Sequence, residues 1–308
     1  MTLALIIATA DRPEALATTL RSLTACDLPE RELHVVVADN GTDEDTERVC
    51  RDTYPGLRVQ YLPVARRGKT AAQNEALRVA NADLLVFTDD DVEFDARWLD
   101  ELWRAARDWP DHLLFGGRVT PIWPERFPTH LEGSAYLGLL YTRLDRGGDE
   151  GPLPGFRPLG PNMALRRKAF ELGVRFDERI GPGSENLPMG DELDITFKVE
   201  ALGGSAVYVP TSCVYHRVRE NQLSLRWQLR RGLDYGRMIA YFDGSAGSAS
   251  LFGVPRWTLR AIPQRCAAAA WNLVRGRRRD AFDTLMTAAF ALGTASAASR
   301  TELSRPNG

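Results

Sequence analysis

Three consecutive carboxylates, Asp89, Asp90 and Asp91, directly follow a short apolar segment. Adjacent negative charges repel one another unless a positive group compensates them. Hard oxygen ligands suit Mg²⁺ or Mn²⁺, and Mg²⁺ commonly takes one or two carboxylates and leaves its other positions to substrate phosphates. The triplet therefore predicts a metal site for a phosphate-bearing substrate. A solvated acidic turn or a helix N-cap is the alternative, because aspartate favours both.

Other carboxylate motifs fit this segment less well. An EF-hand calcium loop that began at Asp89 would need glycine at its sixth position, where this chain has Phe94. The phosphatase pattern DxDx[TV] would need threonine or valine where Glu93 stands.

A second acidic cluster, Asp191, Glu192 and Asp194, follows Gly190 about a hundred residues later. A carboxylate here fits a general base, which must come within hydrogen-bond reach of the hydroxyl that it deprotonates. The preceding segment, 181–190, is rich in glycine and proline and has the composition of a loop that closes over substrates. Acidic residues in a first helical turn also stabilise the helix dipole, so a structural role remains the alternative.

The first hundred residues alternate apolar strand segments with helical periodicity. The four expected strands are Leu3–Ala8, Leu33–Ala38, Leu57–Leu62 and Leu84–Phe87. Apolar strands that alternate with helices predict an α/β fold with a mostly parallel sheet, covered on both faces. Ligands of such sheets bind at the carboxyl ends of the strands. Three polar segments follow strands, Thr9–Arg12, Asp39–Gly41 and Asp89–Asp91, and we expect them to converge at one edge.

The composition bounds the class of protein. The chain has 308 residues, of which 44% are hydrophobic and 26% charged, which is ordinary for a globular protein. Its formal net charge of -2 argues against a basic nucleic-acid-binding protein, and no nucleic-acid partner is expected. The four cysteines are far apart and form no CxxC pair, which favours a reducing, cytoplasmic setting. The apolar runs Met1–Ala8 and Thr284–Ser299 are too short for a signal-peptide core and a membrane span.

Taken together, these features resemble the family 2 glycosyltransferases, which have the GT-A fold. The matching motifs occur in order: Ala8-Thr9-Ala10-Asp11-Arg12, Asp39-Asn40-Gly41, Gly68 with Ala72 and Asn74, Thr88-Asp89-Asp90-Asp91, Gly160-Pro161-Asn162-Met163-Ala164, Phe176-Asp177-Glu178, Asp191-Glu192 and Tyr215-His216. The resemblance implies a Rossmann-like, mostly parallel central sheet flanked by helices, with a C-terminal helical appendage. It divides the chain into a glycosyltransferase domain, residues 1–220, and an arginine-rich helical region, residues 221–308. Within the domain, residues 1–115 form the nucleotide-binding half and residues 116–220 the acceptor half.

The resemblance also implies donor-binding roles. Thr9 and Arg12 would line the nucleotide, and Asp39 would contact its base or ribose. Asp89 would reach the ribose, with Asp90 close by.

A positive residue is expected at the donor phosphates. The family commonly has an arginine before Asn74, and this chain has Gln73 there. Lys69 or Arg67 would supply the phosphate contact instead.

The resemblance assigns Asp91 to the metal, which would be Mg²⁺ or Mn²⁺. His216 is a second metal ligand, because neutral imidazole is an acceptable donor; a satisfied structural histidine is the alternative. The second carboxylate of the late acidic pair is the family's catalytic base, and this maps to Glu192. The usual Glu-Asp order is reversed here, so Asp191 is the other candidate base.

These roles imply an inverting, metal-dependent enzyme. It would move a single sugar from a nucleotide-diphosphate sugar to an acceptor hydroxyl, in polysaccharide, glycolipid or glycosylated-metabolite biosynthesis. Segment Gln222–Trp227 is one residue too long for the QxxRW motif of processive synthases. The alternatives are a sugar nucleotidyltransferase and a non-catalytic nucleotide-sugar-binding protein. The lack of glycine in Ala8–Pro13 counts against the first, and intact Asp91 and Glu192 count against the second.

The last third of the chain mixes tryptophan with arginine. The residues concerned are Arg256, Trp257, Arg260, Arg265, Trp271, Arg275 and Arg277–Arg279. Such helices can lie on an anionic membrane surface, which would place the enzyme peripherally at the inner face of the membrane with a lipid-linked acceptor. A solvated helical cap on the main domain is the alternative.

Overall fold

The computed structural model describes the backbone of residues 1–28, 32–184, 186–243, 250–251 and 254–298. It describes the side chains of the same residues except 250–251, 254–259 and 298, so those of Arg256 and Trp257 lie outside the described set. The chain divides into two compact units. The first comprises Met1–Ile122, Thr142–Glu185 and Gly190–Arg217, and the second comprises Trp123–Tyr141, Asn186–Met189 and Val218–Gly308.

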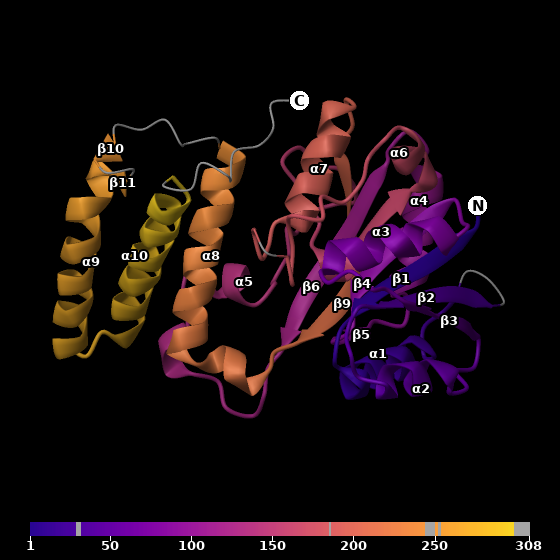
Figure 1. The fold of residues 1–308 in the computed structure, drawn as a ribbon, viewed down its shortest axis with the longest axis horizontal. Helices are drawn as coiled ribbons and strands as arrows, with labels where there is room; N and C mark the ends of the chain where they lie inside the picture. The colour runs from indigo at the N-terminus through magenta and orange to yellow at the C-terminus, as the bar shows by residue number, and fades with distance from the viewer. Residues whose placement is uncertain (29–31, 185, 244–249, 252–253, 299–308) are drawn as a thin grey trace. The chain divides into compact units, whose positions relative to one another are not determined.

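The first unit is built on a sheet in which the described residues form nine strands, in the order β3-β2-β1-β4-β8-β6-β9-β5 with β7 beside β9. The first four strands of this order are β3 (Leu57–Pro63), β2 (Leu33–Asp39), β1 (Leu3–Thr9) and β4 (Leu84–Asp89). Each pairs in parallel with its neighbour (Figure 1). Strands β1, β2 and β4 are almost wholly buried. The predicted α/β fold with a parallel strand–helix half is therefore confirmed.

The remaining strands make the sheet mixed. They are β8 (Met163–Arg166), β6 (Leu114–Ile122), β9 (Ala206–Arg217), β5 (Val92–Phe94) and β7 (Gly151–Pro152). β8 runs antiparallel to both β4 and β6, whereas β6 and β9 are parallel. β5 follows β4 by a tight turn and pairs antiparallel with β9. The aspartate triplet therefore connects β4, in the middle of the sheet, to β5 at the end of the strand order.

Side chains of β1 alternate between two hydrophobic layers. Leu3, Leu5 and Ile7 face the layer that contains α1 (Pro13–Leu23), α2 (Asp45–Arg51) and α4 (Trp98–Asp108). Ala4 and Ile6 face the layer that contains α3 (Lys69–Val79), α6 (Arg167–Glu171) and α7 (Asp191–Ala201). Figure 1 shows α3 on one side of the parallel strands and α1 and α2 on the other. Helices thus cover both faces of the sheet and leave its strand ends for polar residues.

The second unit contains three long helices in its described part. They are α8 (Leu225–Asp243), α9 (Arg256–Val274) and α10 (Arg278–Ala298). Its shorter elements are η1 (Thr129–Leu131), α5 (Leu137–Leu140), η3 (Glu220–Leu223), β10 (Ser250–Leu251) and β11 (Val254–Pro255). The described residues beyond 220 are therefore mostly helical, as expected for a C-terminal helical appendage. None of the helices that the structure describes is long and apolar enough to cross a membrane.

Two glycines hold α8 and α10 together. A Cβ at Gly236 would lie 2.0 Å from the carbonyl oxygen of Phe290, and a Cβ at Gly293 would lie 1.9 Å from that of Leu233. No larger residue fits either position without moving a helix backbone.

Candidate active site

Polar residues of three neighbouring strands meet at one edge of the sheet. Thr9 at the end of β1 is the register partner of Asp39 at the end of β2. On the other side of β1, Ala8 is the register partner of Asp89 at the end of β4. The expected convergence of strand ends is confirmed, because parallel strands in register end together.

Asp90 is buried and bonds to Thr9 of β1, to Thr19 of α1 and to Arg12 between them. It is 1% exposed, and Oγ1 of Thr9 donates a 2.6 Å hydrogen bond to its Oδ2. Nη1 of Arg12 lies 2.9 Å from its Oδ1, and Oγ1 of Thr19 donates to its backbone carbonyl at 2.8 Å. Burial, opposed by Arg12, raises the pKa of Asp90 to about 7. Both carboxylate oxygens are thus occupied by protein groups, and the predicted donor contact of Asp90 stays a prediction.

Arg12 lies just before α1 and faces the triplet. Its Nη1 donates to Oδ2 of Asp91 at 3.0 Å as well as reaching Asp90. Burial disfavours its charge, but the attraction of the three aspartates outweighs burial and raises the pKa of Arg12. The side chain of Arg12 is still 38% exposed, so its guanidinium remains accessible to a ligand beside Asp91.

Asp39 is held from two sides. Its Oδ1 accepts the backbone N–H of Gly41 at 2.9 Å, and its Oδ2 accepts the hydroxyl of Tyr61 at 3.2 Å. Burial first, and then Asp39, raise the pKa of Tyr61 to about 12, so this phenol is a hydrogen-bond donor. The carboxylate is therefore fixed at the strand edge.

Asp89, Asp91 and His216 form a candidate metal centre. Each offers one ligand atom, and the three atoms lie within 4.8 Å of one another. Nε2 of His216 is 3.3 Å from Oδ1 of Asp91, because β9 pairs with β5 and sets His216 opposite Val92. Two carboxylates and an imidazole are donors that a divalent cation such as Mn²⁺ accepts, so the residues present fit the expected metal. The group includes Asp89, to which the resemblance gave the ribose.

Lys69, the first residue of α3, stands between the two acidic clusters. Its Nζ donates a 2.5 Å hydrogen bond to Oδ1 of Asp89 and lies 4.0 Å from Oδ2 of Asp191. Burial disfavours the ammonium, but Asp89, Asp191 and Glu192 outweigh it and raise the pKa of Lys69 above its ordinary value. The lysine is thus a fixed cation shared by both clusters.

The two candidate bases have different surroundings. Asp191 is 3% exposed, and its Oδ2 has no hydrogen-bond partner among the described residues. Burial, followed by repulsion from Glu192, raises the pKa of Asp191 well above its usual range. Glu192 is more exposed, and its Oε1 accepts the backbone N–H of Gly160 at 3.1 Å. A Cβ at position 160 would lie 2.7 Å from that oxygen, so glycine is what allows the contact.

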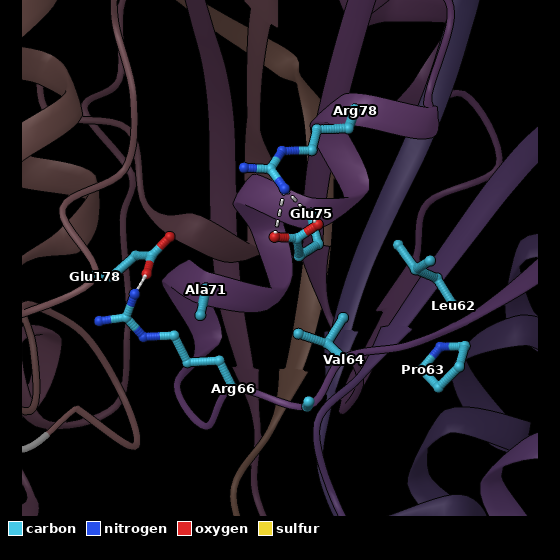
Figure 2. Close-up of a pocket in the computed structure, with 9 residues that line it drawn as sticks. Leu62, Pro63, Val64, Arg66, Ala71, Glu75, Arg78 and Glu178 are labelled. Atoms are coloured by element: carbon cyan, nitrogen blue, oxygen red, sulfur yellow. Dashed lines mark hydrogen bonds and ion pairs between the residues drawn. The ribbon is translucent and has the colours of Figure 1, made fainter.

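A pocket of about 390 Å³ lies beside the outer face of α3 (Figure 2). Leu62, Pro63 and Val64 form its apolar wall. Its charged residues pair with each other, Arg66 with Glu178 and Arg78 with Glu75. None of the residues predicted for the site lines this pocket, so the chemistry belongs to the strand-end edge.

Two contributors to the site were missed from the sequence. Tyr61 holds Asp39, and Thr19 holds the turn of the triplet by also accepting the N–H of Val92 at 3.1 Å. Thr19 could have been identified from the sequence, because it is a polar residue on the apolar face of α1, three residues after Leu16. Tyr61 carried none, since a tyrosine in a strand is ordinary.

A mixed Rossmann-like sheet with this carboxylate edge defines the class of α/β enzymes that have the GT-A fold. The model of the family described as "Glycosyl transferase family 2" matches residues 4–173. The chain belongs to this family and is a glycosyltransferase.

Several relatives are similar over most of the chain. The succinoglycan biosynthesis protein ExoM of Rhizobium meliloti is 32% identical over 253 residues, 76% of this chain and 74% of ExoM. The glucosyl-dolichyl phosphate glucuronosyltransferase of Haloferax volcanii is 24% identical over 229 residues, 73% of this chain and 72% of that protein. The N-acetylglucosaminyl-diphospho-decaprenol L-rhamnosyltransferase of Mycobacterium tuberculosis is 28% identical over 215 residues, 61% of this chain and 67% of that protein.

Solved structures share the fold. The mannosyltransferase PcManGT of Pyrobaculum calidifontis, in complex with GDP-Man and Mn²⁺, has a TM-score of 0.58 at 18% identity, covering 94% of this chain and 85% of PcManGT. Residues 1–349 of S. aureus TarS, in complex with UDP-GlcNAc, have a TM-score of 0.53 at 16% identity, covering 94% of this chain and 90% of that one. At these identities the likeness shows the fold alone.

Proposed function

We propose that this chain moves a single sugar from a nucleotide-diphosphate sugar to an acceptor hydroxyl, with inversion and with Mg²⁺ or Mn²⁺ bound. The observation that carries the proposal is the position of Lys69, which faces Asp89 of the candidate metal centre and Asp191 of the acidic pair. A displacement needs one group of charges for the leaving group and a separate base for the nucleophile. PcManGT with GDP-Man and Mn²⁺, and TarS with UDP-GlcNAc, support the donor class because they share the fold.

On the donor side, Asp91 and His216 would hold the metal together with Asp89. A divalent cation held there would supply positive charge opposite the departing diphosphate. Arg12 and Lys69 are the cations that contact this group, and we assign them to the donor phosphates.

The nucleoside end is assigned to the neighbouring strand ends. Asp39 lies there in register with Thr9, and its fixed carboxylate suits a base or ribose contact. Thr9 acts mainly through Asp90, to which it donates a hydrogen bond.

On the acceptor side, we assign the base to Glu192. It takes the proton of the acceptor hydroxyl, and that oxygen bonds to the anomeric carbon on the face opposite the diphosphate. The carbon–oxygen bond to the diphosphate breaks, and its electron pair leaves with the diphosphate. Glu192 is preferred because it is more exposed than Asp191 and is oriented by the N–H of Gly160.

The acceptor proposed is a saccharide on a lipid diphosphate or phosphate carrier, in polysaccharide or glycolipid biosynthesis. Two relatives carry dolichyl phosphate or diphospho-decaprenol in their names, and a third belongs to succinoglycan biosynthesis. We propose that residues 1–220 perform the transfer and that residues 221–308 associate peripherally with the cytoplasmic face of the membrane.

A donor panel tests the proposal. UDP-, GDP- and dTDP-sugars are titrated into the protein with and without Mn²⁺, and binding and slow hydrolysis are followed. We expect one nucleotide to bind with a strong dependence on Mn²⁺. No binding by any member of the panel would sink the proposal.

Two isosteric variants separate the candidate bases. We expect Glu192→Gln to lower transfer by roughly 10²–10⁴-fold, the usual contribution of a general base, with donor affinity retained. Asp191→Asn should retain more activity. NMR of the product's anomeric proton reports stereochemistry, and retention of configuration would refute the inverting mechanism.

A further inference from the structure

Helix α9 and the residues that follow it, up to Arg279, carry charged side chains of positive sign only. Between Arg256 and Arg279 the chain has seven arginines and no aspartate or glutamate. The four arginines after the helix's last aromatic residue, Arg275 and Arg277–Arg279, are all exposed. Within this segment no acidic side chain competes with an external anion for the arginines; the next residue, Asp280, pairs with Arg279 at 3.1 Å.

One face of α9 packs within the second unit. Its described residues with reduced exposure are Ala261, Ile262, Arg265, Ala269 and Asn272. Apart from the adjacent Ala261 and Ile262 they are three or four positions apart, so they lie on one side of the helix. Helix α9 contacts α10 within this unit.

The opposite face of α9 is apolar and exposed. At 100° per residue, the positions on the side opposite the packed residues are Pro263, Ala267, Ala270, Trp271 and Val274, and all five are exposed. We call these five residues the α9 stripe. Trp271 is 55% exposed and Val274 is 79% exposed, and neighbouring Leu273 is 56% exposed. Large apolar side chains gathered at a helix end mark a binding surface rather than ordinary surface composition.

We propose that the α9 stripe binds an anionic lipid surface. The arginines supply attraction to negative headgroups, and the stripe supplies apolar area that enters the headgroup–acyl boundary. Trp271 suits that boundary, because indole is favoured at membrane interfaces. The guanidinium of Arg275 lies 4.5 Å from the centre of the Trp271 ring, so one anchor combines the apolar and the cationic group.

This inference deepens the proposed function, since a lipid-linked acceptor lies at such a surface. It does not depend on the chemistry of the strand-end edge, because every residue that it uses lies on or beside α9. Vesicle binding and donor hydrolysis in solution can therefore fail separately.

Co-sedimentation of the full chain with vesicles tests the proposal. We expect binding to phosphatidylglycerol–phosphatidylcholine vesicles, weakening with salt, and little binding to pure phosphatidylcholine. The triple variant Arg275→Gln/Arg277→Gln/Arg278→Gln should bind roughly 100-fold more weakly, at about 1 kcal/mol per arginine. The double variant Trp271→Ser/Val274→Ser should also lose binding.

Matched variants control for general effects. Arg48→Gln/Arg51→Gln/Arg58→Gln removes three arginines that are 75%, 74% and 60% exposed in the first unit and should bind as the parent. Leu292→Ser removes an apolar residue of α10 that is 46% exposed and should also bind as the parent.

Lipid depth is read from brominated lipids, which quench indole. Trp271→Phe keeps an aromatic anchor, so it should still bind while losing part of the quenching. The proposal is overturned if anionic vesicles do not bind, if the α9 variants bind as tightly as the controls, or if Trp271→Ser instead dissolves a dimer of this chain that does not bind vesicles.

Discussion

The ammonium of Lys69 lies 2.5 Å from Oδ1 of Asp89, and only 12% of the lysine side chain is exposed. The same nitrogen is 4.0 Å from Oδ2 of Asp191. One buried cation therefore lies next to two acidic residues that the sequence separates by about a hundred residues. This arrangement makes the two halves of the site electrostatically dependent on each other.

The first prediction removes that cation. Lys69→Met keeps the length of the side chain but leaves Asp89 without its cation, and breaking a buried pair costs about 3 kcal/mol of the free energy of unfolding. Denaturation in the presence of a chelator measures this. Added Mn²⁺ should stabilise the variant more than the parent, because it supplies charge next to Asp89.

An exposed ion pair provides the control for Lys69. Arg78 is 74% exposed in its pair with Glu75, so Arg78→Met should cost no more than about 1 kcal/mol. If both variants lose the same free energy of unfolding, the Lys69–Asp89 pair contributes no more to stability than an exposed ion pair.

The second prediction concerns the metal. Asp91→Asn and His216→Gln each remove a donor from the candidate centre, and we expect Mn²⁺ affinity to fall at least tenfold in each. Electron paramagnetic resonance of free Mn²⁺ measures the affinity. Asp90→Asn is the contrast, because Asp90 is outside the candidate centre and both of its carboxylate oxygens are occupied by Thr9 and Arg12. It should lose stability while retaining most of the Mn²⁺ affinity; parent-like affinity in Asp91→Asn would contradict the assignment.

The strand-end edge could be predicted because it depends on local patterns. Apolar segments such as Leu3–Ala8 set the strands, and parallel order then brings Thr9, Asp39 and Asp89 together. The direction of β8 could not be predicted in this way, since a strand's pattern does not record which neighbour it pairs with.

The resemblance assigned Asp91 to the metal and Asp89 to the ribose, but the contacts of each aspartate could not be derived from the sequence. Arg12 contacts both Asp90 and Asp91, but Asp90 accepts a hydrogen bond from Thr9, whereas Asp91 meets His216 across the β5–β9 pairing. Such differences arise from tertiary contacts between distant segments. The same holds for the membership of Trp123–Tyr141 in the second unit.

The third prediction tests the backbone contact of the proposed base. A Cβ at Gly160 would lie 2.7 Å from Oε1 of Glu192 and 2.9 Å from Nζ of Lys69. Gly160→Ala should therefore displace the carboxylate and lower kcat roughly 100-fold, the effect of a misplacement of about 1 Å. Steady-state transfer assays measure it. Gly204→Ala is the control, because its Cβ would lie 3.2 Å from Val199, away from the site; similar losses in both variants would refute the contact's role.

The last prediction uses the buried state of Asp191. Burial raises its pKa in the folded chain well above the usual range, whereas the unfolded value is about 3.9. The unfolded state therefore releases this proton first as pH rises, and the parent loses stability above about pH 4 until the folded pKa is reached, by at most about 1.4 kcal/mol per pH unit. Asp191→Asn does not titrate at position 191, so its melting temperature relative to the parent should rise from pH 4 to pH 7 in chelator.

Asp177 supplies the opposite case, since its hydrogen bond from Arg179 lowers its pKa. Asp177→Asn should fall relative to the parent as pH rises from 3 to 5. A difference for Asp191→Asn that stays constant with pH would mean that Asp191 is ionised beside Lys69 throughout.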